Sequence, residues 1–190
     1  MEALLHQDKT FEKVSYPNSA ISNREFEGCV FKNCDFSNAD FSQNRFTDCQ
    51  FVGCNLAMLK LNRSTLHDVT FRECKLTGID FSKCEEFLFT VRFENCLLDY
   101  ASFLKRKMPK TYFINSSLKN AVFEGATLTK AVFDNTDLAG AVFEGAQLNE
   151  ANLVTAYNYT IDPEVCNIKK ARFSQSGLSG LLTKYGIRIE

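Results

Sequence analysis

The chain has 190 residues, of which 45% are hydrophobic and 24% are charged, and its formal net charge is −1. This length fits one domain with a substantial core, and the near-zero charge gives no overall attraction to nucleic acid or to anionic membranes. No apolar run approaches the ~18 residues needed to span a bilayer. The first residues also lack the basic start and long apolar core of a signal peptide. We therefore expect a cytoplasmic protein without a membrane segment.

A large apolar residue recurs at every fifth position from Phe11 to Phe81. This period fits neither the 3.6 residues of a helical turn nor the alternation of a strand, and a fixed short period is typical of a solenoid. The period is lost at Glu86 and returns two residues late, with Leu88 as its next apolar centre, before it continues to Leu153. We therefore predict a two-residue insertion between residues 82 and 92, accommodated in a bulge.

Four such blocks, or twenty residues, would make one coil in which residues twenty apart stack. Phe11, Phe31, Phe51 and Phe71 would then form one column, and other columns would contain mainly Leu. A ten-residue alternation would produce the same sorting, so the pattern supports four blocks in each coil without proving it.

The repeated block strongly resembles that of the pentapeptide-repeat proteins, in which a small residue, a polar residue and Leu or Phe precede two variable positions. NADFS, LTGIDF and GAVFEGAQLNEANL carry the resemblance. It implies an all-β fold, a right-handed quadrilateral parallel β-helix, closed here by a short C-terminal capping helix. We expect an N-terminal cap in residues 1–10, the repeat solenoid in residues 11–153, and a loop, a last coil and a helical tail in residues 154–190.

Two segments depart from the repeat. At residues 104–110 the small position holds Arg106, which is costly to bury without a partner. We therefore predict a basic outward bulge formed by Lys105, Arg106, Lys107 and Lys110. Residues after Leu153 form a predicted polar loop, and a helix is expected from Leu178 to Tyr185, with Ser176 as its cap and Gly186 at its end.

The eight cysteines all occupy the small position, where Cys serves as a compact buried hydrophobe. The chain has no CxxC pair and only two histidines, His6 and His67. We therefore expect structural thiols rather than disulfides or metal ligands, no cofactor, and no catalytic residue. Exposed carboxylates are expected to solvate the surface, so the prediction is a protein that is not an enzyme.

Charge changes sign along the chain. Residues 101–119 carry five basic groups and no acids, whereas residues 120–165 carry seven acids and one base, Lys130. The predicted partner-binding acidic band consists of Glu124, Asp134, Asp137, Glu144 and Glu150. It would favour a charged partner, although a solvated surface explains the same pattern.

The tail, from Gly180 to Ile189, looks like the C-terminal cap of the quinolone-resistance (Qnr-like) branch of the family. That resemblance implies a non-catalytic DNA mimic that binds DNA gyrase or topoisomerase IV, without contacting nucleic acid directly. The alternative is a structural or regulatory protein-interaction scaffold with no gyrase activity. The same resemblance implies a homodimer formed through Leu178, Leu181, Leu182, Tyr185 and Ile187.

Overall fold

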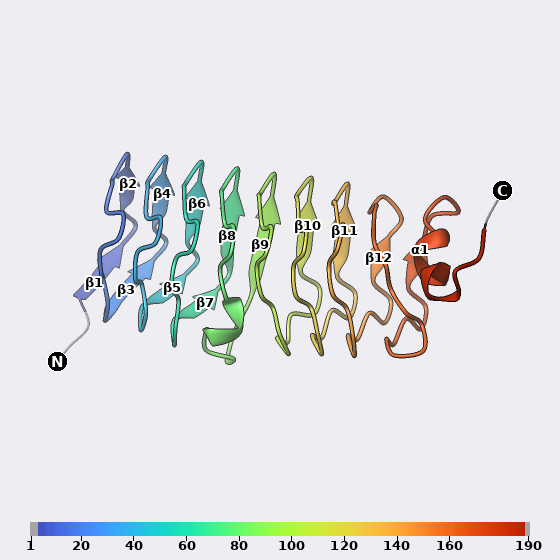
Figure 1. Cartoon of the computed structure of the whole chain (residues 1–190). Coiled ribbons are helices and arrows are strands. Elements are labelled where there is room, and N and C mark those ends of the chain that lie inside the picture. Colours follow the sequence, from blue (N-terminus) through green and yellow to red (C-terminus); the bar gives the residue numbers. More distant parts are fainter. Residues whose placement is uncertain (1–3, 189–190) are drawn as a thin grey trace.

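The computed structural model describes residues 4–188 and shows a parallel β-helix with one short C-terminal α-helix (Figure 1). Residues 1–3 of the predicted cap and residues 189–190 of the predicted tail lie outside the described residues. The elements are β1 (Leu4–Gln7), β2 (Thr10–Glu12), β3 (Arg24–Glu27), β4 (Val30–Lys32), β5 (Arg45–Thr47), β6 (Gln50–Val52), β7 (Thr65–His67), β8 (Val69–Arg72), β9 (Val91–Glu94), β10 (Tyr112–Ile114), β11 (Val132–Asp134), β12 (Asn152–Leu153), β13 (Arg172–Phe173) and α1 (Ser179–Leu182), with 3-10 helices at Phe81–Lys83 and Thr183–Tyr185.

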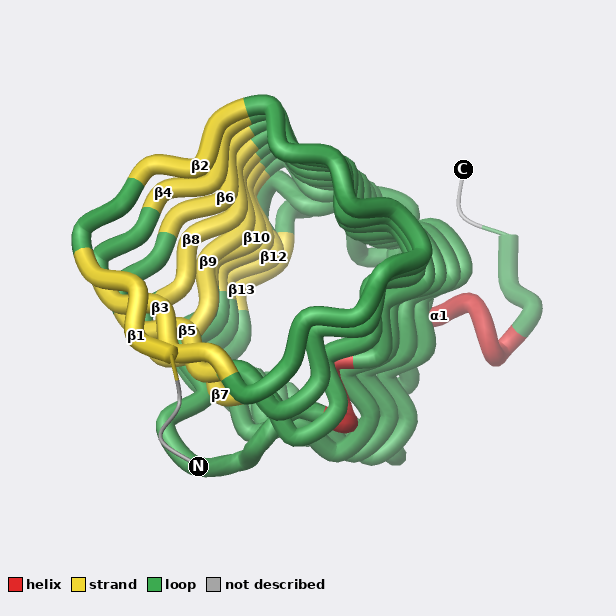
Figure 2. The backbone as a smooth tube through the Cα atoms, turned by 90° about the vertical axis from the view of Figure 1, so that its left-hand side faces the viewer, coloured by secondary structure: helices red, strands yellow, loops and turns green. Residues whose placement is uncertain are grey.

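The strands form two parallel sheets, one of nine strands in the order β13-β12-β11-β10-β9-β8-β6-β4-β2 and one of four in the order β1-β3-β5-β7. Phe11 pairs with Phe31, and Phe31 with Phe51, so four blocks do form each coil. Single bridges continue the stacking on the other sides of the rod. We name the four sides visible in Figure 2 by one buried centre each: side A (Phe113), side B (Leu118), side C (Phe123) and side D (Leu128).

The core is a continuous column of rings and small side chains. On side A, Phe31 stacks on Phe51 with ring centres 4.5 Å apart, and on side C, Phe81 stacks on Phe103 at 4.9 Å. Rings of sides A and C also meet edge to face, as Phe93 and Phe103 do at 6.0 Å. Both geometries add attraction to the burial of apolar area, so the repeat of Phe fixes the twenty-residue register.

The register shifts once, at the insertion. Phe71 pairs with Phe93, twenty-two residues later instead of twenty. The predicted centre Leu88 is wrong, because its side chain is 47% exposed while that of Phe89 is 5% exposed and points into the core. The extra residues follow Cys84, and the backbone rejoins the regular coil at β9.

Both ends of the repeat extend further than its regular sequence. Residues 4–7, in the predicted cap, form β1 and pair with β3, so the sheet begins before residue 11. At the other end, Leu153 pairs with Phe173, and Tyr159 and Ile161 are buried between them. The predicted polar loop is thus an irregular twenty-residue coil, whose larger apolar side chains keep the core filled.

The tail forms the predicted short helix as α1 followed by a 3-10 turn. Gly186 ends it with φ near +60°, where its N–H donates to the Thr183 carbonyl. Ser176 does not cap the helix: its hydroxyl lies 3.1 Å from that of Ser174, and the residue before α1 is Leu178. Gly180 packs against Tyr159, and its carbonyl accepts from the Ile161 N–H at 3.0 Å, which joins the tail to the last irregular coil.

Candidate interaction surfaces

The filled interior leaves the outer surface as the place where function must lie. The ring of His6 stacks on Phe26 at 4.9 Å, and His67 Nε2 lies 3.3 Å from Asp68 Oδ2 on the outside. Among residues 4–188, no three His, Cys, Asp or Glu side chains gather in a metal-binding arrangement.

The predicted acidic band is distributed around the rod rather than along one side. Glu124 and Glu144 stack on side C, two residues after the paired Val122 and Val142, and both are exposed. Asp134 lies in β11 on side A, where it accepts from the Thr155 hydroxyl at 2.7 Å. Side C therefore carries two of these five carboxylates on neighbouring coils.

The other two acids of the band are engaged within the rod. Asp137, on side B, is 8% exposed and lies 3.3 Å from Lys119 Nζ. Burial raises the pKa of Asp137, but hydrogen bonds from Asn158, the Ala139 N–H and Lys119 outweigh it and lower the pKa overall. Glu150 Oε2 lies 3.6 Å from Lys130 Nζ, which belongs to the preceding coil. Both carboxylates therefore form ion pairs within the rod.

The predicted basic bulge at residues 104–110 does not form. Arg106 is 4% exposed, and its guanidinium donates to the carbonyls of Phe81 (2.6 Å), Cys84 (2.7 Å) and Glu85 (3.0 Å). Burial lowers its pKa. The insertion one coil earlier turns these carbonyls inward. Arg106 therefore has hydrogen-bond acceptors in the core, and the prediction that it would face outward is wrong. Lys105 and Lys110 are exposed, and Lys107 pairs with Glu86 at 2.9 Å.

The bulge instead lies in the insertion, and it displays apolar side chains. Phe87 is 77% exposed and Leu88 is 47% exposed. A hollow of about 540 Å³ beside them is lined by Glu86, Leu88, Phe89 and Lys110, among others. Because Arg106 binds the carbonyls of Cys84 and Glu85, the loop that carries Phe87 at the surface is anchored at its start. We name residues 84–89 the insertion loop.

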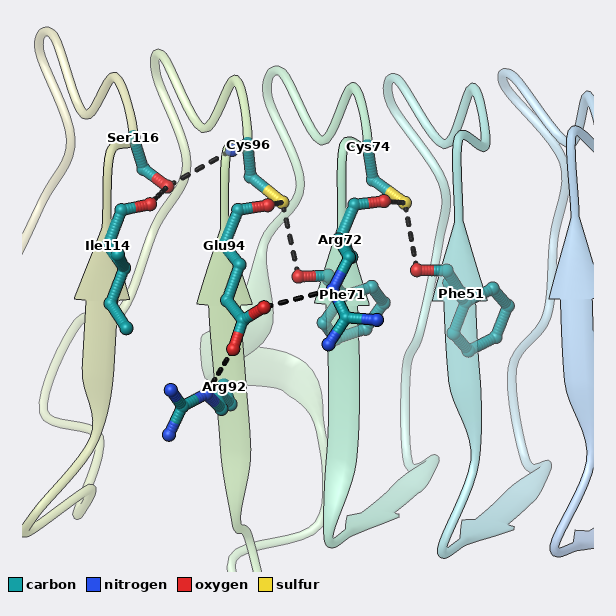
Figure 3. Close-up of polar contacts among 9 residues, drawn as sticks. All are labelled: Phe51, Phe71, Arg72, Cys74, Arg92, Glu94, Cys96, Ile114 and Ser116. Atoms are coloured by element: carbon teal, nitrogen blue, oxygen red, sulfur yellow. Dashed lines mark hydrogen bonds and ion pairs between the residues drawn. The ribbon is translucent and has the colours of Figure 1, made fainter.

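A second polar cluster lies on side A (Figure 3). Glu94 accepts from Arg72 Nε at 2.9 Å and from Arg92 Nε at 2.5 Å, and both bonds lower the pKa of its carboxyl. The Arg92 guanidinium also lies 4.7 Å from the ring centre of Tyr112. Glu94 thus joins two neighbouring coils and holds both arginines close to the sheet.

The cysteines occupy the inward small position, as predicted, and all eight are buried and free. Cys74 Sγ contacts the carbonyls of Phe51 and Arg72, each at 3.3 Å, and Cys96 repeats the pattern one coil later (Figure 3). Ser116 takes the same place in the next coil and donates to the Ile114 carbonyl at 2.8 Å. Burial raises the pKa of Cys34 to about 11 and that of Cys49 to about 12. These thiols are structural donors.

Three of the five predicted dimer residues face outward. Leu178, Tyr185 and Ile187 are 46%, 55% and 56% exposed, whereas Leu181 packs against the core and Leu182 is partly buried. Lys184 holds the tail to the rod through Asp162 at 2.7 Å and Glu164 at 2.6 Å.

Comparison with protein families identifies the repeat. A family described as "Pentapeptide repeat region" matches residues 24–103, and one described as "Pentapeptide repeats (8 copies)" matches residues 110–154. The chain belongs to the pentapeptide-repeat family. The two matches flank residues 104–109, where Arg106 replaces the usual small residue.

Solved structures show the same pentapeptide-repeat fold. A trypsin-treated form of QnrB1, described as a plasmid-mediated fluoroquinolone resistance protein, superposes with a TM-score of 0.70 at 20% identity, over 99% of each chain. Full-length QnrB1 gives 0.64 at 20% identity, over 96% of this chain and 100% of QnrB1. No curated protein sequence matches this chain. Within residues 4–188, no helix has the length and apolar character to cross a membrane.

The insertion loop is the surface of this pentapeptide-repeat rod that sequence reasoning missed. The signal was present in the run Phe87-Leu88-Phe89, three large apolar residues where the repeat offers one inward position. One ring can enter the core, so at least one of the others must face solvent. Recognising Phe89 as the buried centre would have placed Phe87 outside.

Proposed function

We propose that this pentapeptide-repeat protein is a non-catalytic binding module that recognises a protein partner through the surface of its rod. The observation that carries the proposal is the insertion loop, which holds Phe87 at 77% exposure on a backbone fixed by Arg106. Large exposed apolar side chains on a preorganised backbone are typical of protein contacts, since little conformational entropy is lost when they bind.

The partner to test first is a type II topoisomerase, because the tail and fold resemble those of the quinolone-resistance branch. In this proposal Glu124 and Glu144 imitate part of a phosphate track on side C, and the protein acts in the cytoplasm. Leu178, Tyr185 and Ile187 would form the contact between two copies. The other acids of the predicted band lie on sides A and B or at the corner between sides D and A. The imitation of DNA phosphates would therefore depend on two carboxylates.

The alternative is a scaffold that binds another protein through the insertion loop and does not act on gyrase. The apolar character of Phe87 and Leu88 favours it. A contact of this kind is insensitive to salt, whereas a carboxylate track that replaces phosphates weakens as salt screens it.

The test is gyrase supercoiling with and without ciprofloxacin, at two salt concentrations, with three variants. E124K/E144K removes the side C track, F87S/L88S removes the apolar loop contact, and D48K/E73K makes the same charge change at the two corners that border side A. Salt-sensitive protection or inhibition of gyrase that only E124K/E144K abolishes would support the DNA mimic. An effect that only F87S/L88S abolishes would assign the gyrase contact to the loop. No effect at a large molar excess would remove gyrase as the partner.

A further inference from the structure

The N-terminal end of the rod is an open end of the β-helix among the described residues. Viewed along the rod, the first coil, residues 4–23, lies in front with no other described segment across it (Figure 2). Leu4, Leu5 and Tyr16 are each about half exposed, at 52%, 50% and 52%. A hollow of about 510 Å³ reaches from Leu4 and Tyr16 to the rings of Phe26 and Phe36.

This end also carries backbone groups without a coil to pair with. In the second coil, the N–H groups of Val30, Asp35 and Asp40 donate to carbonyls of the first coil. The equivalent residues one coil earlier are Thr10, Ser15 and Ala20, whose N–H groups point away from the rod. Backbone groups alternate in direction along the coil, so further carbonyls lie on this edge. They belong to Leu5, Gln7, Glu12, Pro17 and Ser22. Open edges of this kind pair with another chain.

We propose that the N-terminal end of the rod is a contact surface for the N-terminal end of a second copy of this chain. An extended peptide would pair with one side and leave the other three sides and the apolar mouth uncovered. A second coil of the same cross-section covers all four sides at once. Two-fold symmetry makes the pairing antiparallel, so each edge residue must meet another edge residue.

The first coil satisfies this condition for a two-fold axis through the middle of two opposite sides. With the two-fold axis through His6 and Tyr16, the opposed edge pairs are Leu5 with Gln7, Thr10 with Ser22, Glu12 with Ala20, and Ser15 with Pro17. Every member of these pairs lies on the free edge. The same axis places Phe11 of one copy over Ile21 of the other, which continues the apolar column.

Charge favours this axis over one through Phe11 and Ile21. Residues 4–25 carry three acids, Asp8, Glu12 and Glu25, and three bases, Lys9, Lys13 and Arg24, so the end is neutral. The axis through His6 and Tyr16 sets Asp8 against Leu4 of the second copy, with Arg24 on the coil behind Leu4, and it opposes no like charges. An axis through Phe11 and Ile21 would set Lys9 against Lys13, which is repulsive.

The test is the molar mass of the full chain by light scattering over a range of concentrations. Tyr16→Glu and Tyr16→Lys each place like charges face to face at the axis, and residue 16 is exposed enough to leave the fold intact. We expect each variant alone to have a lower mass than the wild type, and an equimolar mixture of the two to regain it. Tyr100→Glu, the same change at a 64% exposed tyrosine on the body of the rod, is the matched control and should keep the wild-type mass.

Two outcomes would overturn the proposal. One is a wild-type mass equal to that of Tyr16→Glu at every concentration, which would also be the result if another protein covers this end. The other is a mixture that stays as small as its components. L178S/I187S, at the opposite end, separates this contact from one through the tail, because it should leave the response to Tyr16→Glu unchanged. The result is independent of any effect on gyrase.

Discussion

The guanidinium carbon of Arg106 lies 4.6 Å from the ring centre of Phe89, and the two side chains join the insertion to the coil that follows it. Phe89 is the residue that the two extra positions bring into the core, and Arg106 occupies the inward position one coil later. The arginine fills the space that the insertion opens and satisfies its carbonyls. We infer that the two irregularities stabilise each other.

Arg106→Ala should lower the free energy of unfolding by about 3 kcal/mol, because the carbonyls of Cys84 and Glu85 lose their donor, that of Phe81 keeps only the Cys84 N–H, and a cavity replaces the guanidinium. Urea unfolding followed by circular dichroism measures this loss. Lys105→Ala, at the neighbouring exposed position, should change stability by less than about 0.5 kcal/mol.

Removing the insertion should rescue the substitution. Deletion of residues 86 and 87 from the Arg106→Ala variant restores a twenty-residue spacing, with Leu88 at the inward centre and a small inward residue one coil later. We expect this protein to be more stable than Arg106→Ala alone. If the deletion gave no recovery, the arginine and the insertion would not be energetically coupled.

Most of the fold follows from the sequence, because the period of five decides which residues face inward. The Phe columns, the inward cysteines and the two-residue insertion are all visible in the order of residues. Arg106 was misplaced because the cost of burying it depends on carbonyls donated by a coil that the period does not describe. The engagement of Asp137 also needed the structure, since the period places this residue on side B but does not predict its contacts with Lys119 and Asn158.

Cys49 should make the protein more stable at neutral pH than at alkaline pH. Its folded-state pKa, about 12, lies above the ordinary value of about 8.5, so its contribution is complete below pH ~8.5 and is lost as pH rises toward 12. The stability difference between wild type and Cys49→Ala should therefore shrink by about 2 kcal/mol from pH 7.5 to pH 10 in urea titrations. A constant difference would show that the thiol ionises equally in both states.

Glu94 should contribute stability at neutral pH that acid removes. Its pKa is lowered by Arg92 and Arg72, so the contribution is present above the ordinary value of about 4.3 and is lost as pH falls through the folded-state value. Glu94→Gln should cost about 1 kcal/mol at pH 7 and almost nothing at pH 3, as measured by unfolding in urea. Glu73→Gln is the control, since Glu73 forms no ion pair among residues 4–188.

Gly180→Ala should loosen the tail. A methyl group at this position would collide with the Tyr159 carbonyl oxygen and ring. We expect faster hydrogen exchange in residues 176–186 and a loss of about 1–3 kcal/mol in the stability of that segment.

Gly186→Ala separates this steric effect from backbone strain. Its added methyl group would meet nothing within 4 Å, but its φ of +60° disfavours a side chain, so about 1 kcal/mol is expected. Equal exchange rates in the two variants would argue against the contact with Tyr159.

The parallel register has a consequence for how the molecule sets distances. Each coil touches only the coils beside it, so a twenty-residue duplication, for example of residues 115–134, would lengthen the rod by one strand spacing of ~4.8 Å without altering the loop or the tail. The distance between Phe87 and Ile187 along the rod would therefore increase by one strand spacing with each added coil. A partner that contacts both would detect the number of coils, and a series of such duplications would measure the reach of that partner along the rod.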